Sequence, residues 1–137
     1  MAEARAASKL PADELDARNK TRQAMKTMLR RVLTMTRSRK DKKSEYILGY
    51  TKEELRSHLE SQFRDGMSWS DRSSFHIDHI IPVAYFLRNG ITDPAVINAL
   101  SNLQVLTPEE NRQKSDSFSE APRRQALVID SSGTRSA

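Results

Sequence analysis

The chain has 137 residues and a formal net charge of +5, with 23 Lys and Arg residues against 18 Asp and Glu residues. This length fits one domain with a modest core, and the basic balance points to an anionic partner. The chain has no cysteine, which excludes disulfides and zinc sites built on Cys-x-x-Cys pairs. No apolar run approaches the ~20 residues of a membrane span, and the N-terminus lacks the apolar core of a secretion signal. We therefore expect a cytoplasmic protein with no membrane partner.

The first predicted element is a long basic helix over 13–39, preceded by a loose leader at 1–11, with Asp13 as a candidate N-cap. Apolar residues recur in this helix at spacings of three and four, which is typical of an amphipathic helix. They are Met25, Met28, Leu29, Val32 and Leu33. Basic residues surround this apolar stripe, and Asp41 is the only acidic residue between Arg18 and Lys43.

A solvated helix face usually mixes both signs of charge, so binding of a phosphate backbone is the better explanation of this basic segment. The candidate contacts are Arg30, Arg31, Arg37, Arg39 and Lys40. Contacts of this kind give affinity and salt dependence but carry no information about base sequence.

Residues 44–50 predict a connection with some strand character. A capping box at Thr51–Glu54 then starts a second helix, which Asp65-Gly66 ends. The residues on one face of this helix are Leu55, Leu59 and Phe63. His58 lies off that face and is predicted to be a surface residue. We expect Trp69 to pack in the core rather than to stack on a base.

Residues 75–81 alternate between apolar and polar side chains, apart from an Ile-Ile pair, which indicates a half-buried strand. On such a strand His76 and Asp78 point to one face and His79 to the other. Pro82 cannot donate a hydrogen bond to a neighbouring strand, so the strand should end before it.

A long connection over 83–101 follows, with a turn at Asn89-Gly90 and a short helix starting at Asp93-Pro94. Residues 103–106 predict a second strand. The sequence Thr107-Pro108-Glu109-Glu110 combines an N-cap, a proline at the first helical position and a glutamate three residues after the cap, so it starts a helix. We expect the tail over 117–137, which is rich in Ser and Arg, to be mostly disordered.

The segments His76–Pro82, Asn102-Leu103 and Asn111–Lys114, in this order and at this spacing, resemble the HNH endonuclease motif, a ββα-metal nuclease site. The resemblance covers roughly residues 49–116. It is strongest to the small HNH proteins common in phage genomes, and it extends to the HNH domain of CRISPR effector nucleases. It implies an α+β fold: a ββα-metal core at 75–116, inside a nuclease domain at 12–116, with additional helices packed around it.

The resemblance also implies roles for individual residues. His79 would be the general base, a task that suits an imidazole with a pKa near ~6.5. Asp78 and Asn111 would bind one divalent ion. Their hard oxygen atoms, with positions left open for water, favour Mg²⁺, with Mn²⁺ or another divalent ion as the alternative. No structural zinc is expected.

Asn102 corresponds to the central asparagine of the motif, which holds the loop between the two strands and orients the base. His76 lies where relatives carry an acidic residue or a histidine, so it is a candidate third metal ligand or phosphate contact. Arg112 and Lys114 are candidates for phosphate binding. Each of these residues taken alone also has an ordinary structural explanation, such as a solvated helix face or a turn.

The resulting hypothesis is a metal-dependent endonuclease, a hydrolase that cleaves DNA phosphodiester bonds, with duplex DNA as its partner. If phage-encoded, it would act in the host cytoplasm. One active site cuts one strand, so a double-strand break would require a homodimer or two encounters. Two alternatives stay open: a nucleic-acid-binding protein that keeps the motif only as a scaffold, and an accessory subunit of a phage packaging or replication machine that needs a partner. RNA is the less favoured substrate.

Overall fold

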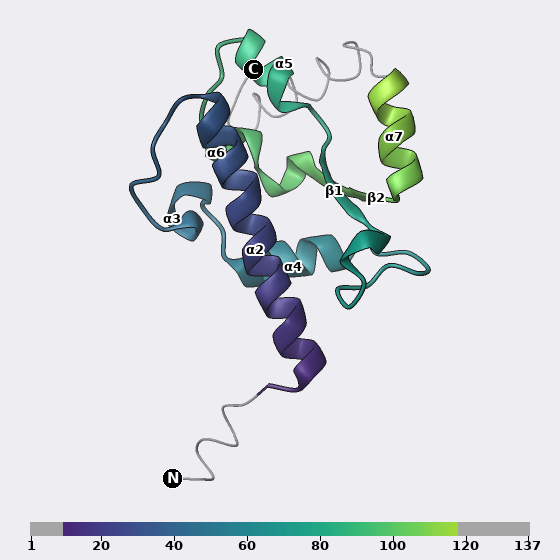
Figure 1. Cartoon of the computed structure of the whole chain (residues 1–137). Helices are drawn as coiled ribbons and strands as arrows, with labels where there is room; N and C mark the ends of the chain where they lie inside the picture. The colour runs from purple at the N-terminus through teal and green to yellow at the C-terminus, as the bar shows by residue number, and fades with distance from the viewer. Residues whose placement is uncertain (1–9, 118–137) are drawn as a thin grey trace, which may run out of the picture.

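The computed structural model describes residues 10–117 and has an α+β fold, in which helices surround a two-stranded antiparallel sheet (Figure 1). In chain order the elements are α2 (Ala12–Met35), α3 (Ser44–Leu48), α4 (Lys52–Glu60), the 3-10 turn η1 (Arg72–Ser74), β1 (His76–His79), α5 (Val83–Arg88), α6 (Pro94–Ile97), the 3-10 turn η2 (Leu100–Asn102), β2 (Leu103–Leu106) and α7 (Pro108–Ser117). The predicted leader and tail fall almost entirely outside the described residues. None of the helices between residues 10 and 117 is both long and apolar enough to cross a membrane.

Helix α2 begins directly after Pro11, so the predicted N-cap at Asp13 is wrong. Asp13 and Glu14 lie instead in the first turn, where their carboxylates interact favourably with the helix dipole. The predicted apolar stripe is confirmed, because every one of its members is buried. The buried residues of α2 are Ala17, Thr21, Ala24, Met25, Met28, Leu29, Val32 and Leu33. The opposite face of the helix stays in solvent.

The C-terminal end of α2 lies at Met35, four residues before the predicted end at Arg39. Arg37 adopts a left-handed conformation with φ of 57°, and the Ser38 N–H donates to the Leu33 carbonyl at 2.8 Å. This is the Schellman arrangement, which ends a helix by satisfying its last carbonyls. Arg37, Arg39 and Lys40 consequently belong to the connection after the helix and not to its basic face.

Because a side chain at a left-handed position such as Arg37 is sterically strained, replacing Arg37 with glycine should stabilise the fold. We expect Arg37→Gly to raise the free energy of unfolding by about 0.5–1 kcal/mol, since a penalty of ~1–2 kcal/mol is removed and part of it is lost to glycine's backbone entropy. Urea unfolding followed by circular dichroism measures the change. Arg39→Gly removes the same charge two residues away, without a positive φ, and should give no gain.

Residues 44–48 form helix α3, so the expectation of strand character there is wrong. Gly49, with φ of 84°, ends this short helix. The predicted capping box of α4 is confirmed: the Glu54 N–H donates to Thr51 Oγ1 at 3.1 Å, and the Thr51 N–H donates to Glu54 Oε1 at 2.8 Å. The apolar face of α4 is buried through Leu55 and Leu59.

An aromatic cluster closes the core beneath the strands. The rings of Trp69 and Phe75 meet edge to face with centroids 5.2 Å apart, and Phe63 contacts both. Trp69 is buried, and its indole N–H donates to Glu60 Oε2 at 2.9 Å. The predicted core role of Trp69 is therefore confirmed.

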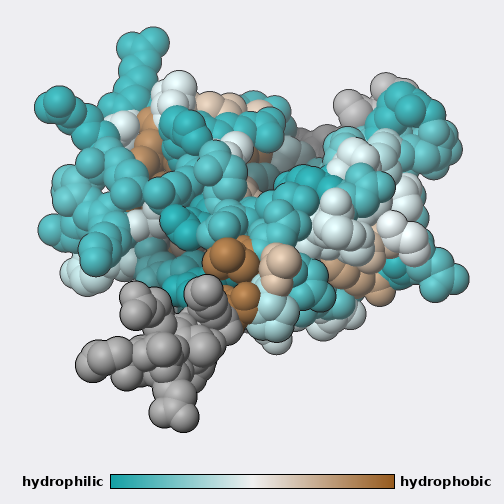
Figure 2. Space-filling view, turned by 60° about the horizontal axis from the view of Figure 1, so that its bottom comes forward, coloured by the Kyte–Doolittle hydropathy of each residue, from teal (hydrophilic) through white to brown (hydrophobic). Residues whose placement is uncertain are grey.

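His58, predicted to lie on the surface, is half-buried, and its Nε2 lies 3.0 Å from the Leu103 carbonyl oxygen of β2. The surface prediction is therefore wrong, because α4 packs against β2 and the imidazole fills part of that contact. A few large apolar side chains remain exposed among residues 10–117, which is normal for a protein surface. The face shown in Figure 2 is accordingly mostly hydrophilic with small hydrophobic areas.

The strands pair in antiparallel register, with His76 opposite Leu106 and His79 opposite Leu103. Strand β1 is shorter than predicted, because Ile80 and Ile81 already bond to Asn102 at the start of the connection. Helix α7 lies against both strands on one side (Figure 1), whereas α4 contacts β2 and α2 packs on α4. The connection between the strands carries α5 and α6, and α6 packs on α2 and α3.

Candidate active site

Strand β1 sends alternate side chains to its two sides, as its sequence pattern predicts. His76 and Asp78 contact residues of α7, while Ile77 and His79 line a hollow beside α2. The candidate base His79 and the candidate metal ligand Asp78 are thus consecutive in sequence but face different helices.

Two polar contacts join β1 to α7. Asn111 Nδ2 lies 2.9 Å from His76 Nδ1, and Lys114 Nζ lies 3.1 Å from Asp78 Oδ2. The same ammonium donates to the His79 carbonyl at 3.0 Å. Because Asn111 and Lys114 are three residues apart, they share the face of α7 that lies along the strand. The structure therefore brings together four predicted site residues: His76, Asp78, Asn111 and Lys114.

The start of α7 is fixed in position by the predicted capping box. Glu110 accepts from the Thr107 N–H at 2.9 Å and donates its own N–H to Thr107 Oγ1 at 3.0 Å. Arg64 also binds both carboxylate oxygens of Glu110, at 2.6 and 2.8 Å. These contacts hold the pKa of the Glu110 carboxyl at about 2. The helix that carries Asn111 is thereby fixed at its N-terminus against the core.

The imidazole of His79 is held by a residue that the sequence analysis missed. Its Nε2 lies 2.5 Å from Oδ1 of Asn98, which is fully buried. Asn98 Nδ2 faces the Met28 carbonyl of α2 at 3.5 Å, so its oxygen is directed at the ring. An amide oxygen only accepts hydrogen bonds, so His79 Nε2 must carry a proton. In the neutral ring Nδ1 is then left unprotonated and basic.

The surroundings of His79 also lower its pKa below the usual value of 6.5. Burial is the largest cause, and the positive charges of Arg31 and Lys114 act in the same direction. The hydrogen bond to Asn98 and the charge of Asp78 oppose the shift without cancelling it. At neutral pH the imidazole is therefore uncharged, which is the form that can accept a proton.

Asn102 holds the loop between the strands, one of the two tasks expected of it. It is buried, with Oδ1 accepting from the Ile81 N–H at 2.7 Å and Nδ2 donating to the carbonyls of Ile81 at 3.1 Å and Ile97 at 2.9 Å. The contact to the His79 ring comes from Asn98 instead. Asn102 therefore acts on His79 through the loop, because it fixes Ile97 directly before Asn98.

The predicted phosphate-binding residues are spread over several surfaces. Arg31 lines the hollow that contains His79, whereas Arg30, the next residue, lines another hollow with Lys40. Arg112 is exposed and forms an ion pair with Glu109 on the same helix. Sequence alone could not separate Arg30 from Arg31, because both lie on the exposed side of one helix.

Other residues of the site were also missed by the sequence analysis. Gln104 Nε2 donates to Asp78 Oδ2 at 2.9 Å across the sheet, since the two residues are register partners. The alternation along residues 103–106 places Gln104 on the outer face, but only the register puts it opposite Asp78. Lys20 reaches the hollow beside His79 from α2, far along the chain, and Arg72 reaches it from η1, just before β1. No motif around either residue predicts that its side chain lies there.

The donor set of the α7 side fits a hard divalent cation. Within residues 10–117 no group of three or more His, Asp or Glu side chains is arranged to hold a metal. A carboxylate from Asp78 and the amide oxygen of Asn111 are the available hard donors, and such a pair suits an ion that keeps most of its ligands as water and phosphate. His76 Nδ1 already contacts the Asn111 amide, so its role as a third ligand would require that contact to break.

Comparison with known protein families, with curated proteins and with solved structures gave no match.

Proposed function

We propose that this protein is a metal-dependent endonuclease of the HNH type that hydrolyses phosphodiester bonds in DNA. The observation that best supports this function is the surroundings of His79. A buried asparagine fixes one ring nitrogen at 2.5 Å, the pKa of the imidazole is lowered, and the preceding residue in the strand is an aspartate paired with α7. A histidine that serves only the core has no need of this combination.

The chain's own groups account for the proton transfer in this reaction. His79 Nδ1 accepts the proton of the attacking water, and the resulting imidazolium is stabilised through its Nε2–H bond to Asn98. Asn98 is held in turn by α2 and by the Tyr50 hydroxyl, which donates to the Asn98 carbonyl at 2.8 Å. Because these partners are in place in the protein alone, little reorganisation is needed when substrate binds.

Asp78 and Asn111 would hold the divalent ion, which supplies charge neutralisation of the phosphate and stabilisation of the leaving 3′ oxygen. Lys114 pairs with Oδ2 of Asp78 and thereby holds this carboxylate in position beside α7. The basic connection after α2, with Arg37, Arg39 and Lys40, would add affinity for the phosphate backbone without reading its sequence.

The function is tested by incubating the purified protein with supercoiled plasmid in the presence of Mg²⁺, Mn²⁺ or EDTA. We expect nicking with either ion and none in EDTA, because water and phosphate complete the coordination of a loosely held ion. Asp78→Asn should lower cleavage at least tenfold, whereas Asp65→Asn, at an exposed turn, should leave it unchanged.

Two outcomes would contradict the proposal. Cleavage that persists in EDTA would exclude a divalent ion. Retardation of the plasmid on a gel, with no cleavage in any metal, would favour a DNA-binding protein that keeps the motif as a scaffold or needs a partner. Parallel incubations with single-stranded DNA and with RNA compare the substrate classes.

A further inference from the structure

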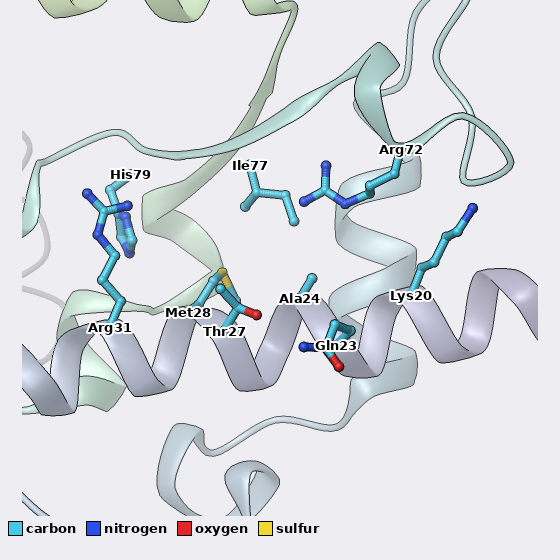
Figure 3. A pocket seen from close by; sticks show the side chains of 9 residues that line it. All are labelled: Lys20, Gln23, Ala24, Thr27, Met28, Arg31, Arg72, Ile77 and His79. Carbon is cyan, nitrogen blue, oxygen red and sulfur yellow. The ribbon is translucent and has the colours of Figure 1, made fainter.

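A groove with a volume of about 360 Å³ runs between α2 and β1, and His79 opens into it (Figure 3). Its wall on one side is the flank of α2 and on the other side the strand with η1. Figure 3 shows Arg31 beside His79 at one end of the groove, and Arg72 and Lys20 toward the other end. The groove therefore extends away from the candidate base along the helix.

The charged groups of this groove are all positive, since none of its lining residues is acidic. Arg72 is held rigidly, with its guanidinium 4.5 Å from the centroid of the Phe75 ring and one N–H donating to the Phe75 carbonyl at 2.8 Å. Lys20 is also fixed, because its ammonium donates to the Trp69 carbonyl at 2.7 Å and pairs with Asp16 at 3.0 Å. The Asp16 carboxylate offsets part of its charge, so Arg72 is the stronger anion-binding group at this end. Cations at both ends, with those at the η1 end held in position, suit a ligand that carries more than one negative charge.

The middle of the groove differs in character from its ends. Ala24 from α2 and Ile77 from β1 line it with apolar groups on opposite sides, and Gln23 and Thr27 supply neutral hydrogen-bonding groups on the α2 side. An apolar centre between cationic ends matches a chain whose phosphates are separated by sugars and bases. The volume of the groove is near the lower limit of the range for small-molecule sites, ~300–1,000 Å³. It can hold a short stretch of one strand but not an intact duplex.

We propose that this groove binds a single-stranded segment of nucleic acid, with its phosphates at Arg31 and Arg72 and its sugars and bases between Ala24 and Ile77. This inference deepens the proposed function, because it directs one strand of the substrate along α2 to the Nδ1 side of His79. It also implies that duplex DNA must open locally, or be frayed, before it is bound.

Arg30 and Arg31 offer a matched pair for testing the groove. Both are exposed arginines of α2, they are adjacent in sequence, and each carries the same charge. Only Arg31 lines the groove, while Arg30 lines a separate hollow together with Lys26 and Lys40. Long-range attraction to an anion is nearly the same from both positions, so a difference between them reports direct contact.

The experiment measures binding of a fluorescent six-nucleotide single-stranded DNA to the full chain in EDTA by anisotropy, at several salt concentrations. We expect Arg31→Gln to weaken binding about tenfold and to reduce the salt slope by about 0.7, and Arg30→Gln to weaken it about twofold or less. Arg72→Lys keeps the charge but loses the stacked, forked geometry, so it should weaken binding by several-fold without the unfolding risk of a larger change.

Equal effects of Arg30→Gln and Arg31→Gln would contradict binding in the groove, because they would mean that long-range charge alone attracts the oligonucleotide. Tighter binding of a DNA hairpin with a blunt six-base-pair stem than of the single strand would contradict the proposal as well. This test requires no cleavage, so it can fail or succeed independently of the proposed function. Binding of the strand that depends on Arg31, without plasmid nicking, would support strand binding in the groove and contradict the nuclease activity. An RNA oligonucleotide of the same sequence compares the two sugars.

Discussion

His79→Ala should lower the rate of phosphodiester cleavage by about 10²–10⁴-fold, the usual contribution of a general base. The loss has a specific physical cause, since the alanine variant has no group at the end of β1 to take the proton from water. His58→Gln is the matched control. That histidine contacts the Leu103 carbonyl, which Gln62 also reaches at 3.3 Å, so the packing of α4 on β2 should survive. Cleavage that persists in His79→Ala would mean that another group is the base.

The pH dependence of the cleavage rate should also identify His79 as the base. The pKa of His79 lies below 6.5 in the folded protein. A base must be unprotonated, so the rate should rise with pH, reach half its maximum below pH ~6.5 and stay level at neutral pH. Arg31→Gln removes a positive charge that lowers this pKa, so the midpoint should move upward. A midpoint that does not respond to Arg31 would argue that a different group titrates.

Variants of Asn98 test whether cleavage depends on the orientation of the His79 ring as well as on its presence. Asn98→Ala leaves His79 Nε2 without its acceptor, so both tautomers become accessible and the rate should fall about tenfold or more. Asn98→Asp keeps an acceptor and adds a negative charge, so it should restore part of the rate while moving the acid limb to higher pH. Nitrogen NMR of the imidazole reads the tautomer directly and independently of activity.

The parts of the fold that sequence predicted well are those governed by local chemistry. The capping boxes at Thr51 and Thr107 set the starts of α4 and α7, and the apolar stripe of α2 set its buried face. The signal lies within about one helical turn for the capping boxes and within a single helix for the stripe. The helix end at Met35 was missed because it depends on Arg37 adopting a left-handed conformation. Arginine seldom adopts this conformation, so the sequence contains no signal for it.

The site was predictable only in part, for a related reason. The alternation along β1 correctly separated Asp78 from His79, but nothing local shows which helix faces each side. Asn98 was missed because its side chain contacts residues outside its own segment, His79 and Met28. It reaches His79 only because α6 packs on α2 and the loop folds back onto the strand end. Tertiary contacts of this kind are set by the whole core, and so are the residues of the groove beside α2.

Asn102→Leu should lower the free energy of unfolding by about 3–5 kcal/mol, the largest effect on stability that we expect from one substitution. The side chains are similar in size, but leucine makes none of the three buried hydrogen bonds to the backbone at Ile81 and Ile97. An unsatisfied buried backbone group costs about 1–3 kcal/mol. Asn89→Ala is the control: Asn89 is exposed and makes one side-chain bond, to the Tyr85 carbonyl, so it should cost under about 1 kcal/mol.

The same variant decides how Asn102 serves the site. If it acts only by closing the loop, the fraction of Asn102→Leu that is folded at low temperature should still place Asn98 against His79 and cleave at a rate proportional to that fraction. Urea unfolding at the assay temperature gives the fraction, and the imidazole NMR gives the tautomer. A folded variant with the normal tautomer but little cleavage would instead assign Asn102 a direct part in the reaction, beyond its bonds to the loop.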